Sequence, residues 1–291
     1  MARRFASASA FKAAVEACLR KKSQESGIPF STCQLKFVIE RLLARLFRVE
    51  PPPWLLKGGF AMDLRFRPQA RTTRDVDLSV VLGGADANPT SPGLRDQLQA
   101  AAEVDLGDYL TYRIGEPRIA LTNAPRGGGR YPCEAVFVGK VYAKLHVDVG
   151  IGDALVGEPE LLVADNILDF AGIEPARVLA IPKPLQFAEK IHAYTFPWSG
   201  RPNTRTKDLV DLVLLIERGL PDPAAIRLAL DATFQTRGTH PLPESLCSPP
   251  DFWARDFPAM AREAGISTAD HLEAFAILRS LWTSLGLGKT A

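Results

Sequence analysis

The sequence predicts an α+β fold, with a mixed sheet in the first part of the chain and a helical second part. Residues 75–81 and 141–151 are rich in β-branched residues and have strand-like patterns. From residue 184 onward, apolar residues recur at helical spacing instead. A chain of 291 residues can form one large or two moderate domains. We expect a core with N-terminal helices over residues 1–155 and a helical lobe over residues 156–291.

The composition is that of a globular protein, with 46% hydrophobic and 23% charged residues. The net charge of +2 does not indicate a general polyanion binder, although local basic clusters could contact nucleic-acid phosphates. The four cysteines have no metal-ligand spacing and are expected to be reduced thiols. Neither a membrane span nor a secretory signal is visible, so we expect a cytoplasmic protein with no membrane partner.

Two helices are predicted before the first strand. Residues 11–22 have helical spacing that stops at Gly27. Residues 34–48 follow, with Ser31 or Thr32 as the expected N-cap and with the charged residues off the apolar stripe. A short apolar strand at residues 54–56 then leads into a glycine pair.

The stretch from Lys57 to Val81 carries the strongest functional pattern. Gly58 and Gly59 allow close approach of a ligand, and the helix that they open can direct N–H groups at a phosphate. The motif D-x-D follows on a predicted strand, where residues two apart share one face. Asp75 and Asp77 are therefore expected side by side.

Two adjacent carboxylates repel each other unless a cation lies between them. Mg²⁺ suits the pair, because it prefers a few carboxylate oxygens together with water and substrate phosphates. The alternative is an ordinary exposed acidic pair at a strand end. The glycine pair and the flanking arginines Arg71 and Arg74 favour the metal site.

A third acid is predicted on a strand at residues 141–151, where apolar residues alternate with polar ones. We expect Asp148 on the outward, polar face, and a hairpin with residues 134–138 through Gly139 and Lys140. A third carboxylate beside the D-x-D strand would complete a metal-binding triad. The alternative is an exposed acid on a half-buried sheet.

The second part of the chain begins with an expected linker at residues 157–184, including a short strand at 178–181. Lys190 lies beside the apolar stripe of the next helix, where a lysine can also extend along the surface to solvent. Asp208 and Asp211 lie one turn apart on a helix that is apolar almost all round, so they need a partner such as Lys190 or a nucleotide. The last helix, at 269–285, is expected to be capped by Ser267 or Thr268.

Four segments, taken in this order, resemble a known protein family: KGGFAMDLRF…ARTTRDVDLSV, HVDVG, KPLQFAEKIHAY and RTKDLVDL. Together they resemble the AbiEii/MenT nucleotidyltransferase-like toxins of bacterial type IV toxin-antitoxin systems. The resemblance implies a polymerase-β-like nucleotidyltransferase core with a mixed sheet and a helical C-terminal lobe, with nucleotide and Mg²⁺ bound in the cleft between them. Some members with this architecture transfer nucleotides from a nucleoside triphosphate to the 3′ end of tRNA and so block translation. The resemblance also implies that a cognate antitoxin is a partner of this protein.

The resemblance assigns roles to individual residues of this sequence. It implies Asp75, Asp77 and Asp148 as metal ligands, with Lys190 as a further catalytic residue that contacts phosphates. The implied nucleotide-binding set is Lys57, Gly58, Gly59, Arg71, Thr73, Lys190, Asp208 and Asp211. Thr73 stands where some members carry serine, and a phosphate on it would compete for Mg²⁺ and repel the triphosphate. The expected chemistry is in-line displacement at the α-phosphate.

Two other functions remain open from the sequence. The same core can transfer nucleotides to a small molecule or to a protein hydroxyl. A catalytically inactive nucleotide- or RNA-binding module is the second alternative, and the intact set of three acids argues against it.

Overall fold

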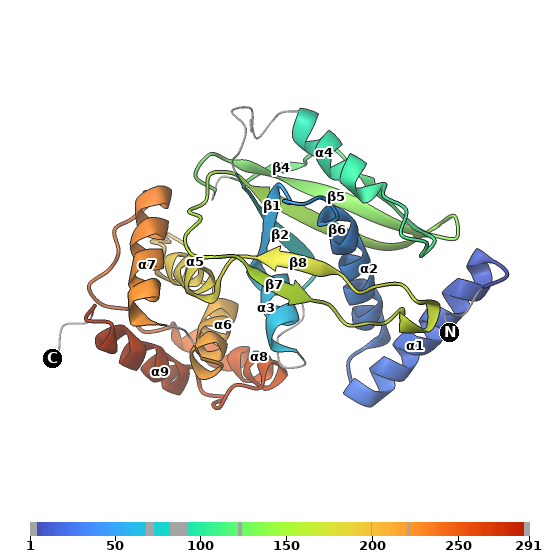
Figure 1. The fold of residues 1–291 in the computed structure, drawn as a ribbon. Coiled ribbons are helices and arrows are strands. Elements are labelled where there is room, and N and C mark those ends of the chain that lie inside the picture. Colours follow the sequence, from blue (N-terminus) through green and yellow to red (C-terminus); the bar gives the residue numbers. More distant parts are fainter. Residues whose placement is uncertain are drawn as a thin grey trace. The chain divides into compact units, whose positions relative to one another are not determined.

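A computed structural model describes residues 5–67, 73–81, 92–121, 124–198, 200–219 and 222–287 (Figure 1). The chain forms two compact units. Unit 1 comprises residues 1–61, 72–152 and 161–180, and unit 2 comprises residues 62–71, 153–160 and 181–291. Within the described residues, no helix has both the length and the hydropathy needed to cross a membrane. All four cysteines are free thiols.

The sheet has the order β3-β5-β6-β2-β1-β8-β7, and β4 pairs with β5 beside this path. Its strands are β1 (Trp54–Lys57), β2 (Asp75–Val80), β3 (Leu110–Ile114), β4 (Ile119–Ala120), β5 (Gly128–Phe137), β6 (Lys140–Gly150), β7 (Glu160–Val163) and β8 (Arg177–Ala180). The β2–β6 and β1–β8 pairs are parallel, whereas the β1–β2 and β5–β6 pairs are antiparallel. The predicted mixed sheet is therefore confirmed, and D-x-D lies on a central strand.

The helices of the first part are α1 (Ala8–Ser26), α2 (Phe30–Leu46), α3 (Gly58–Phe66) and α4 (Pro92–Ala102). α2 packs against β6 and β8, and α4 packs against β3. α1 ends at Ser26 and is capped by Gly27, where the sequence predicts that the helical pattern stops; Gly27 adopts the left-handed conformation. The predicted cap of α2 is wrong: the helix begins directly after Pro29, whose carbonyl accepts from the N–H groups of Thr32 and Cys33.

The charged side of α2 is also more buried than its periodicity indicates. Arg45 Nη1 and Nη2 donate to Asp108 at 3.0 and 2.6 Å, and Arg41 Nε donates to the same carboxylate at 2.8 Å. Arg41, Arg45 and Asp108 are all buried. These arginines hold the pKa of Asp108 below its ordinary value, although burial alone would raise it. Two arginines of α2 thus stabilise the segment that leads into β3.

The predicted linker at residues 157–184 is wrong in large part. It contains β7, a 3₁₀ turn at Asp169–Ala171, and β8, which pairs in parallel with β1 at Leu56 and Ala180. The predicted short strand at 178–181 corresponds to β8. β7 was not expected, because it is only four residues long and its sequence, ELLV, does not alternate between apolar and polar residues; Leu161 and Val163 are both exposed.

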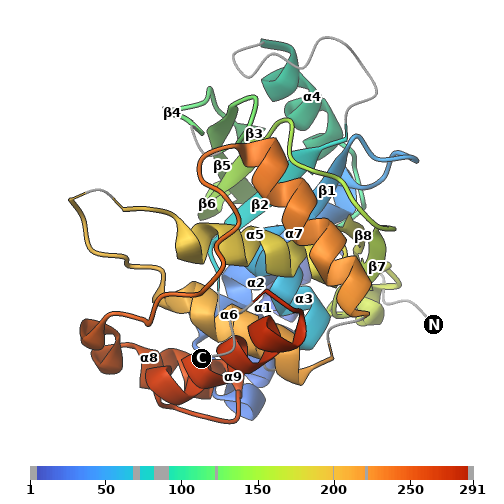
Figure 2. The ribbon, with the colours of Figure 1, turned by 90° about the vertical axis from the view of Figure 1, so that its left-hand side faces the viewer.

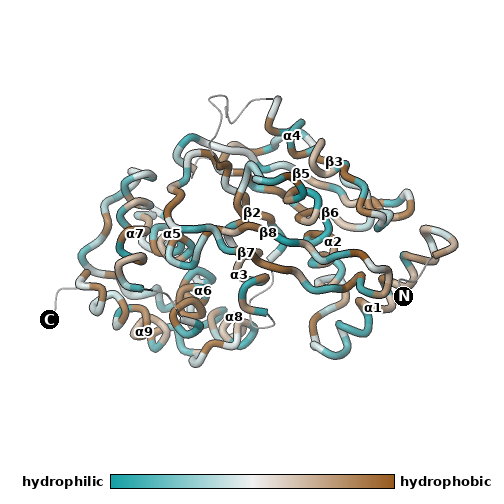
Figure 3. Tube along the Cα trace, in the orientation of Figure 1, coloured by the Kyte–Doolittle hydropathy of each residue, from teal (hydrophilic) through white to brown (hydrophobic). Residues whose placement is uncertain are grey.

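Unit 2 contains α5 (Lys183–Thr195), α6 (Thr206–Glu217), α7 (Pro223–Arg237), a 3₁₀ turn (Asp251–Arg255), α8 (Phe257–Ala264) and α9 (His271–Ser284). In Figure 2, α6 lies between α5 and the α8–α9 pair, and these helices pack together. Figure 3 shows α6 as hydrophobic over most of its length, consistent with its nearly complete burial. Asp270 caps α9 through the N–H groups of Leu272 and Glu273, so the predicted caps Ser267 and Thr268 are wrong.

Candidate active site

The two acids of D-x-D lie on one face of β2, as predicted. Val76 and Leu78 are fully buried on the opposite face, whereas Asp75 and Asp77 are partly exposed. This alternation follows from the two-residue period of a strand. The buried valine and leucine fix the strand and thereby fix the direction of both carboxylates.

A row of four charged residues crosses the sheet at Asp77. Lys57 of β1 lies opposite Asp77, Asp77 lies opposite Asp148 of β6, and Asp148 lies opposite Arg130 of β5. Two acids in adjacent central strands are thus flanked by one basic residue on each side. The predicted proximity of Asp148 to the D-x-D strand is confirmed.

Arg130 forms a bidentate salt bridge with Asp148. Its Nε donates to Oδ1 at 2.8 Å and its Nη2 donates to Oδ2 at 2.6 Å, a geometry typical of strong arginine–carboxylate pairs. Nη2 also lies 3.9 Å from Oδ2 of Asp75. The hydrogen bonds to Asp148, together with the nearby acids, raise the pKa of Arg130 above its ordinary value.

The expected exposure of Asp148 is therefore wrong, because the residue is only 7% exposed. The alternation in residues 141–151 also fails at its start, since Val141 is 47% exposed. A β-bulge at Ala135 and Val136 shifts the β5–β6 register by one residue and brings Arg130, rather than Gly129, opposite Asp148. The sequence analysis missed Arg130, because the predicted partner strand covered only residues 134–138, whereas β5 begins at Gly128.

Gly58 lies against the carboxylate of Asp77 where β1 passes into α3. Its φ is +64°, in the left-handed region, and a Cβ there would lie 2.0 Å from Oδ2 of Asp77. Only glycine satisfies both conditions without strain. The group that approaches Gly58 closely is thus the carboxylate of Asp77. Gly59 lies in the first turn of α3.

The donor chemistry of this face suits a hard divalent cation. Asp75 and Asp77 offer carboxylate oxygens from one face of β2, and Mg²⁺ commonly uses one or two such ligands with water and phosphates. Across the described parts of the chain, no group of three or more His, Cys, Asp or Glu side chains is arranged to hold a metal ion. Asp148 is held by Arg130, so a positive group already neutralises the third acid.

Unit 2 brings three of the predicted residues together. Lys190 Nζ lies 2.8 Å from Asp208 Oδ1 and 2.7 Å from Asp211 Oδ2, and Lys190 is 8% exposed. The alternative of a lysine extended to solvent is therefore wrong. Arg205, which the sequence analysis did not single out, also pairs with Asp208. The predicted need of these buried acids for a partner is met by Lys190.

The structure places the remaining predicted residues in or next to β1 and β2, with the exception of Arg71. Thr73 and Arg74 lie in an irregular segment directly before β2. Arg71 lies outside the described residues. Lys57 ends β1 beside Gly58.

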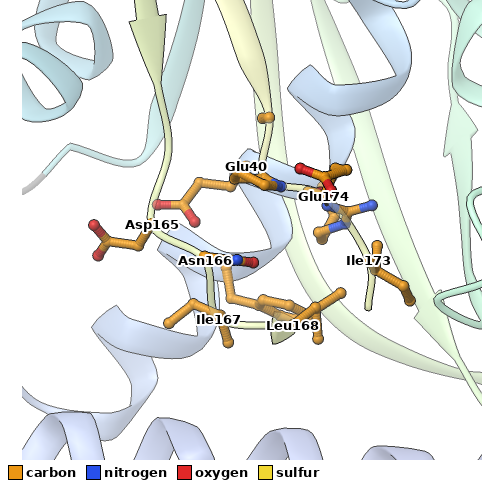
Figure 4. Close-up of a pocket in the computed structure, with 11 residues that line it drawn as sticks. Glu40, Asp165, Asn166, Ile167, Leu168, Ile173 and Glu174 are labelled. Carbon is orange, nitrogen blue, oxygen red and sulfur yellow. Dashed lines mark hydrogen bonds between the residues drawn. The ribbon is translucent and has the colours of Figure 1, made fainter. Parts of the chain in front are cut away.

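A small pocket lies elsewhere in unit 1 (Figure 4). It is lined by α2 and by the segment between β7 and β8, and Figure 4 shows Glu40 facing the loop that carries Asp165 and Asn166. None of the predicted metal- or nucleotide-binding residues lines this pocket. Its location therefore gives no support for a nucleotide site there.

A mixed sheet with this acid-bearing strand pair, together with the helical unit 2, defines a nucleotidyltransferase-like protein. The family model described as "Nucleotidyl transferase AbiEii toxin, Type IV TA system" matches residues 41–285. The chain therefore belongs to the AbiEii family of nucleotidyltransferase toxins of type IV toxin-antitoxin systems. The predicted resemblance is confirmed, and membership implies a nucleoside triphosphate substrate and an antitoxin partner.

Two solved structures are similar to this chain. MenT4, a nucleotidyltransferase toxin from Mycobacterium tuberculosis, is similar with a TM-score of 0.58 and 14% identity, covering 94% of this chain and 98% of that one. JHP933 from Helicobacter pylori is more distant, with a TM-score of 0.44, 12% identity and coverage of 88% and 91%. Among curated proteins, none matches the chain significantly in sequence.

Proposed function

We propose that this chain transfers a nucleoside monophosphate from a nucleoside triphosphate to RNA, at the 3′ end of tRNA, and thereby blocks translation. The proposal rests on the Asp77–Asp148 pairing of parallel strands β2 and β6, with Asp75 on the same face as Asp77. Three acids at adjacent positions suit phosphoryl chemistry better than they suit a structural role, because they repel one another. The proposed location is the cytoplasm, where RNA and the cognate antitoxin would be encountered.

The proposed metal is Mg²⁺, with Asp75, Asp77 and Asp148 as its ligands. Mg²⁺ would supply charge neutralisation for the triphosphate and for the leaving pyrophosphate. In the alternative role, Asp148 would accept the proton of the attacking hydroxyl instead of holding the metal. A bond forms between that hydroxyl oxygen and the α-phosphorus, the bond to the pyrophosphate oxygen breaks, and pyrophosphate leaves.

The proposed nucleotide-binding residues lie at the β1–α3 junction and in the segment before β2, together with three residues of unit 2. Gly58 and Gly59 would offer backbone N–H groups to phosphate oxygens. The others are Lys57, Arg71, Thr73, Lys190, Asp208 and Asp211. Lys190 already has two carboxylate partners at 2.8 and 2.7 Å, so its contact with phosphates remains a prediction.

A transfer assay with each of the four radiolabelled triphosphates on total RNA tests the proposal. We expect metal-dependent labelling of the tRNA fraction, abolished by periodate oxidation of the RNA 3′ ends. Asp75→Asn provides the negative control, and Asp231→Asn, an exposed acid on α7, provides the matched charge control. Labelling of a metabolite pool or of protein, with none of RNA, would instead favour the small-molecule or protein-hydroxyl alternative.

A further inference from the structure

The guanidinium of Arg130 lies where a cation would be needed among the three acids. It is hydrogen-bonded to both oxygens of Asp148, and its Nη2 is 3.9 Å from Asp75. The side chain of Asp148 is 10% exposed, so this carboxylate has little access to solvent while the pair is formed. An ionised carboxylate so buried needs a positive partner.

The backbone of Arg130 is fixed on both sides, so only its side chain has freedom to move. Its main chain pairs with Asp148 across β5–β6 and with Ile119 across β4–β5. The side chain, in contrast, is 34% exposed. Rotation of this side chain would release Asp148 without any change in the sheet.

We propose that Arg130 is a built-in counter-ion that closes the acid site by holding Asp148, and that a divalent cation must displace it before Asp148 can serve as a ligand. Arg130 is thus a positioning residue: it sets the affinity of the acids for a divalent cation. This inference rests on the proposed function for the identity of the metal site, and on the Arg130 contacts for the competition.

Two effects of Arg130 oppose metal binding. The guanidinium occupies both oxygens of Asp148, and its positive charge repels a second cation close to Asp75. Removing the arginine removes both effects. The repulsion among the three acids is then less compensated, which favours uptake of a divalent cation.

The test is calorimetric titration of the full chain with Mn²⁺ and no nucleotide, supported by the shift in melting temperature with metal. We expect Arg130→Gln to bind Mn²⁺ about tenfold more tightly than the wild type. Arg130→Lys keeps the charge and should restore an affinity close to that of the wild type. Lys144→Gln is the matched control, because Lys144 pairs with Glu134 at 2.8 Å, away from Asp148.

Equal or weaker Mn²⁺ binding by Arg130→Gln would overturn the inference, as would an equal gain in Lys144→Gln. Asp148→Asn in the Arg130→Gln background should cancel the gain, and persistence of the gain would also count against the competition. Failure of this inference can be distinguished from failure of the proposed function. RNA labelling by the wild type with unchanged metal affinity in Arg130→Gln would defeat only this inference, whereas tighter metal binding without any RNA labelling would defeat only the RNA proposal.

Discussion

Gly58 touches the carboxylate of Asp77 so closely that the site has no room for a side chain at this position. A Cβ would come within 2.0 Å of Oδ2 and 2.9 Å of the Asp77 Cβ. The contact ties the β1–α3 junction to the D-x-D strand. A substitution at Gly58 can therefore displace the Asp77 carboxylate without changing its charge.

We expect Gly58→Ala to lower stability and to abolish RNA labelling, because alanine both resists the positive φ and pushes the Asp77 carboxylate away. Gly27→Ala is the matched control: its φ is +70°, yet nothing lies within 4 Å of the added Cβ. Gly27→Ala should cost about 1 kcal/mol in urea denaturation and keep full activity. Equal activity in the two variants would mean that the position of Asp77 is not critical.

Asp75→Asn is expected to remove metal-dependent transfer while changing the free energy of unfolding by less than about 0.5 kcal/mol. The side chain of Asp75 is 41% exposed, so its charge contributes little to packing. Transfer assays and denaturation curves on the same preparations measure both quantities. Retention of wild-type transfer rates would exclude Asp75 from the site.

Lys190→Met should destabilise unit 2 by about 3 kcal/mol, because it leaves two buried carboxylates without their lysine. Lys21→Met, at an exposed lysine that pairs with Glu25 at 3.7 Å, is expected to cost less than about 0.5 kcal/mol. Chemical denaturation gives both values. Triphosphate binding by the still-folded Lys190→Met protein then tests the proposed phosphate contact: unchanged affinity would leave Lys190 with a structural role alone.

The stability of unit 2 should fall in acid because of His192. Burial, together with Arg237 and His240, lowers the pKa of His192 from 6.5 to about 3. The unfolded chain therefore takes up a proton near pH 6.5 that the folded chain refuses, so stability is lost as pH falls below that value. His192 Nε2 lies 2.8 Å from Thr239 Oγ1, and its ring packs 4.6 Å from that of His240.

The effect of His192 at pH 5 should be about 1 kcal/mol, allowing for partial screening by solvent. His192→Gln should flatten the dependence of unfolding free energy on pH between 7 and 5. Urea denaturation at several pH values measures this slope. A slope equal to that of the wild type would show that other groups control the acid sensitivity.

Phosphorylation of Thr73 is expected to silence the enzyme. The residue lies two positions before Asp75, and a phosphate would add about −1.5 to −2 charges beside the acids. Thr73→Glu should therefore reduce transfer strongly, whereas Thr73→Val should remain active. Mass spectrometry after co-expression with the cognate antitoxin tests modification directly. Full activity of Thr73→Glu and an unmodified Thr73 would together reject this regulation.

The parts of the site that could be predicted are those encoded by local patterns. The D-x-D strand follows from the alternation of Val76 and Leu78 with the two acids, and the hairpin follows from the turn at Gly139. The predicted partner strand, residues 134–138, stops short of Arg130, and counting further back from the turn without the bulge would place Gly129 opposite Asp148. The same limit applies to Arg45, because its partner Asp108 is distant along the chain and helical periodicity reports nothing about it.

The parallel pairing of β2 with β6 also has a consequence for the order in which the protein folds. The two strands are far apart in sequence, and such long-range parallel pairs form late, after local hairpins. The β5–β6 hairpin contains both Arg130 and Asp148, so we expect the buried acid to be paired with Arg130 before it reaches β2. While β6 is still inside the ribosome, the nascent chain exposes Asp75 and Asp77 but not the third acid, Asp148. We therefore expect the acid set to be completed only after most of unit 1 has been synthesised.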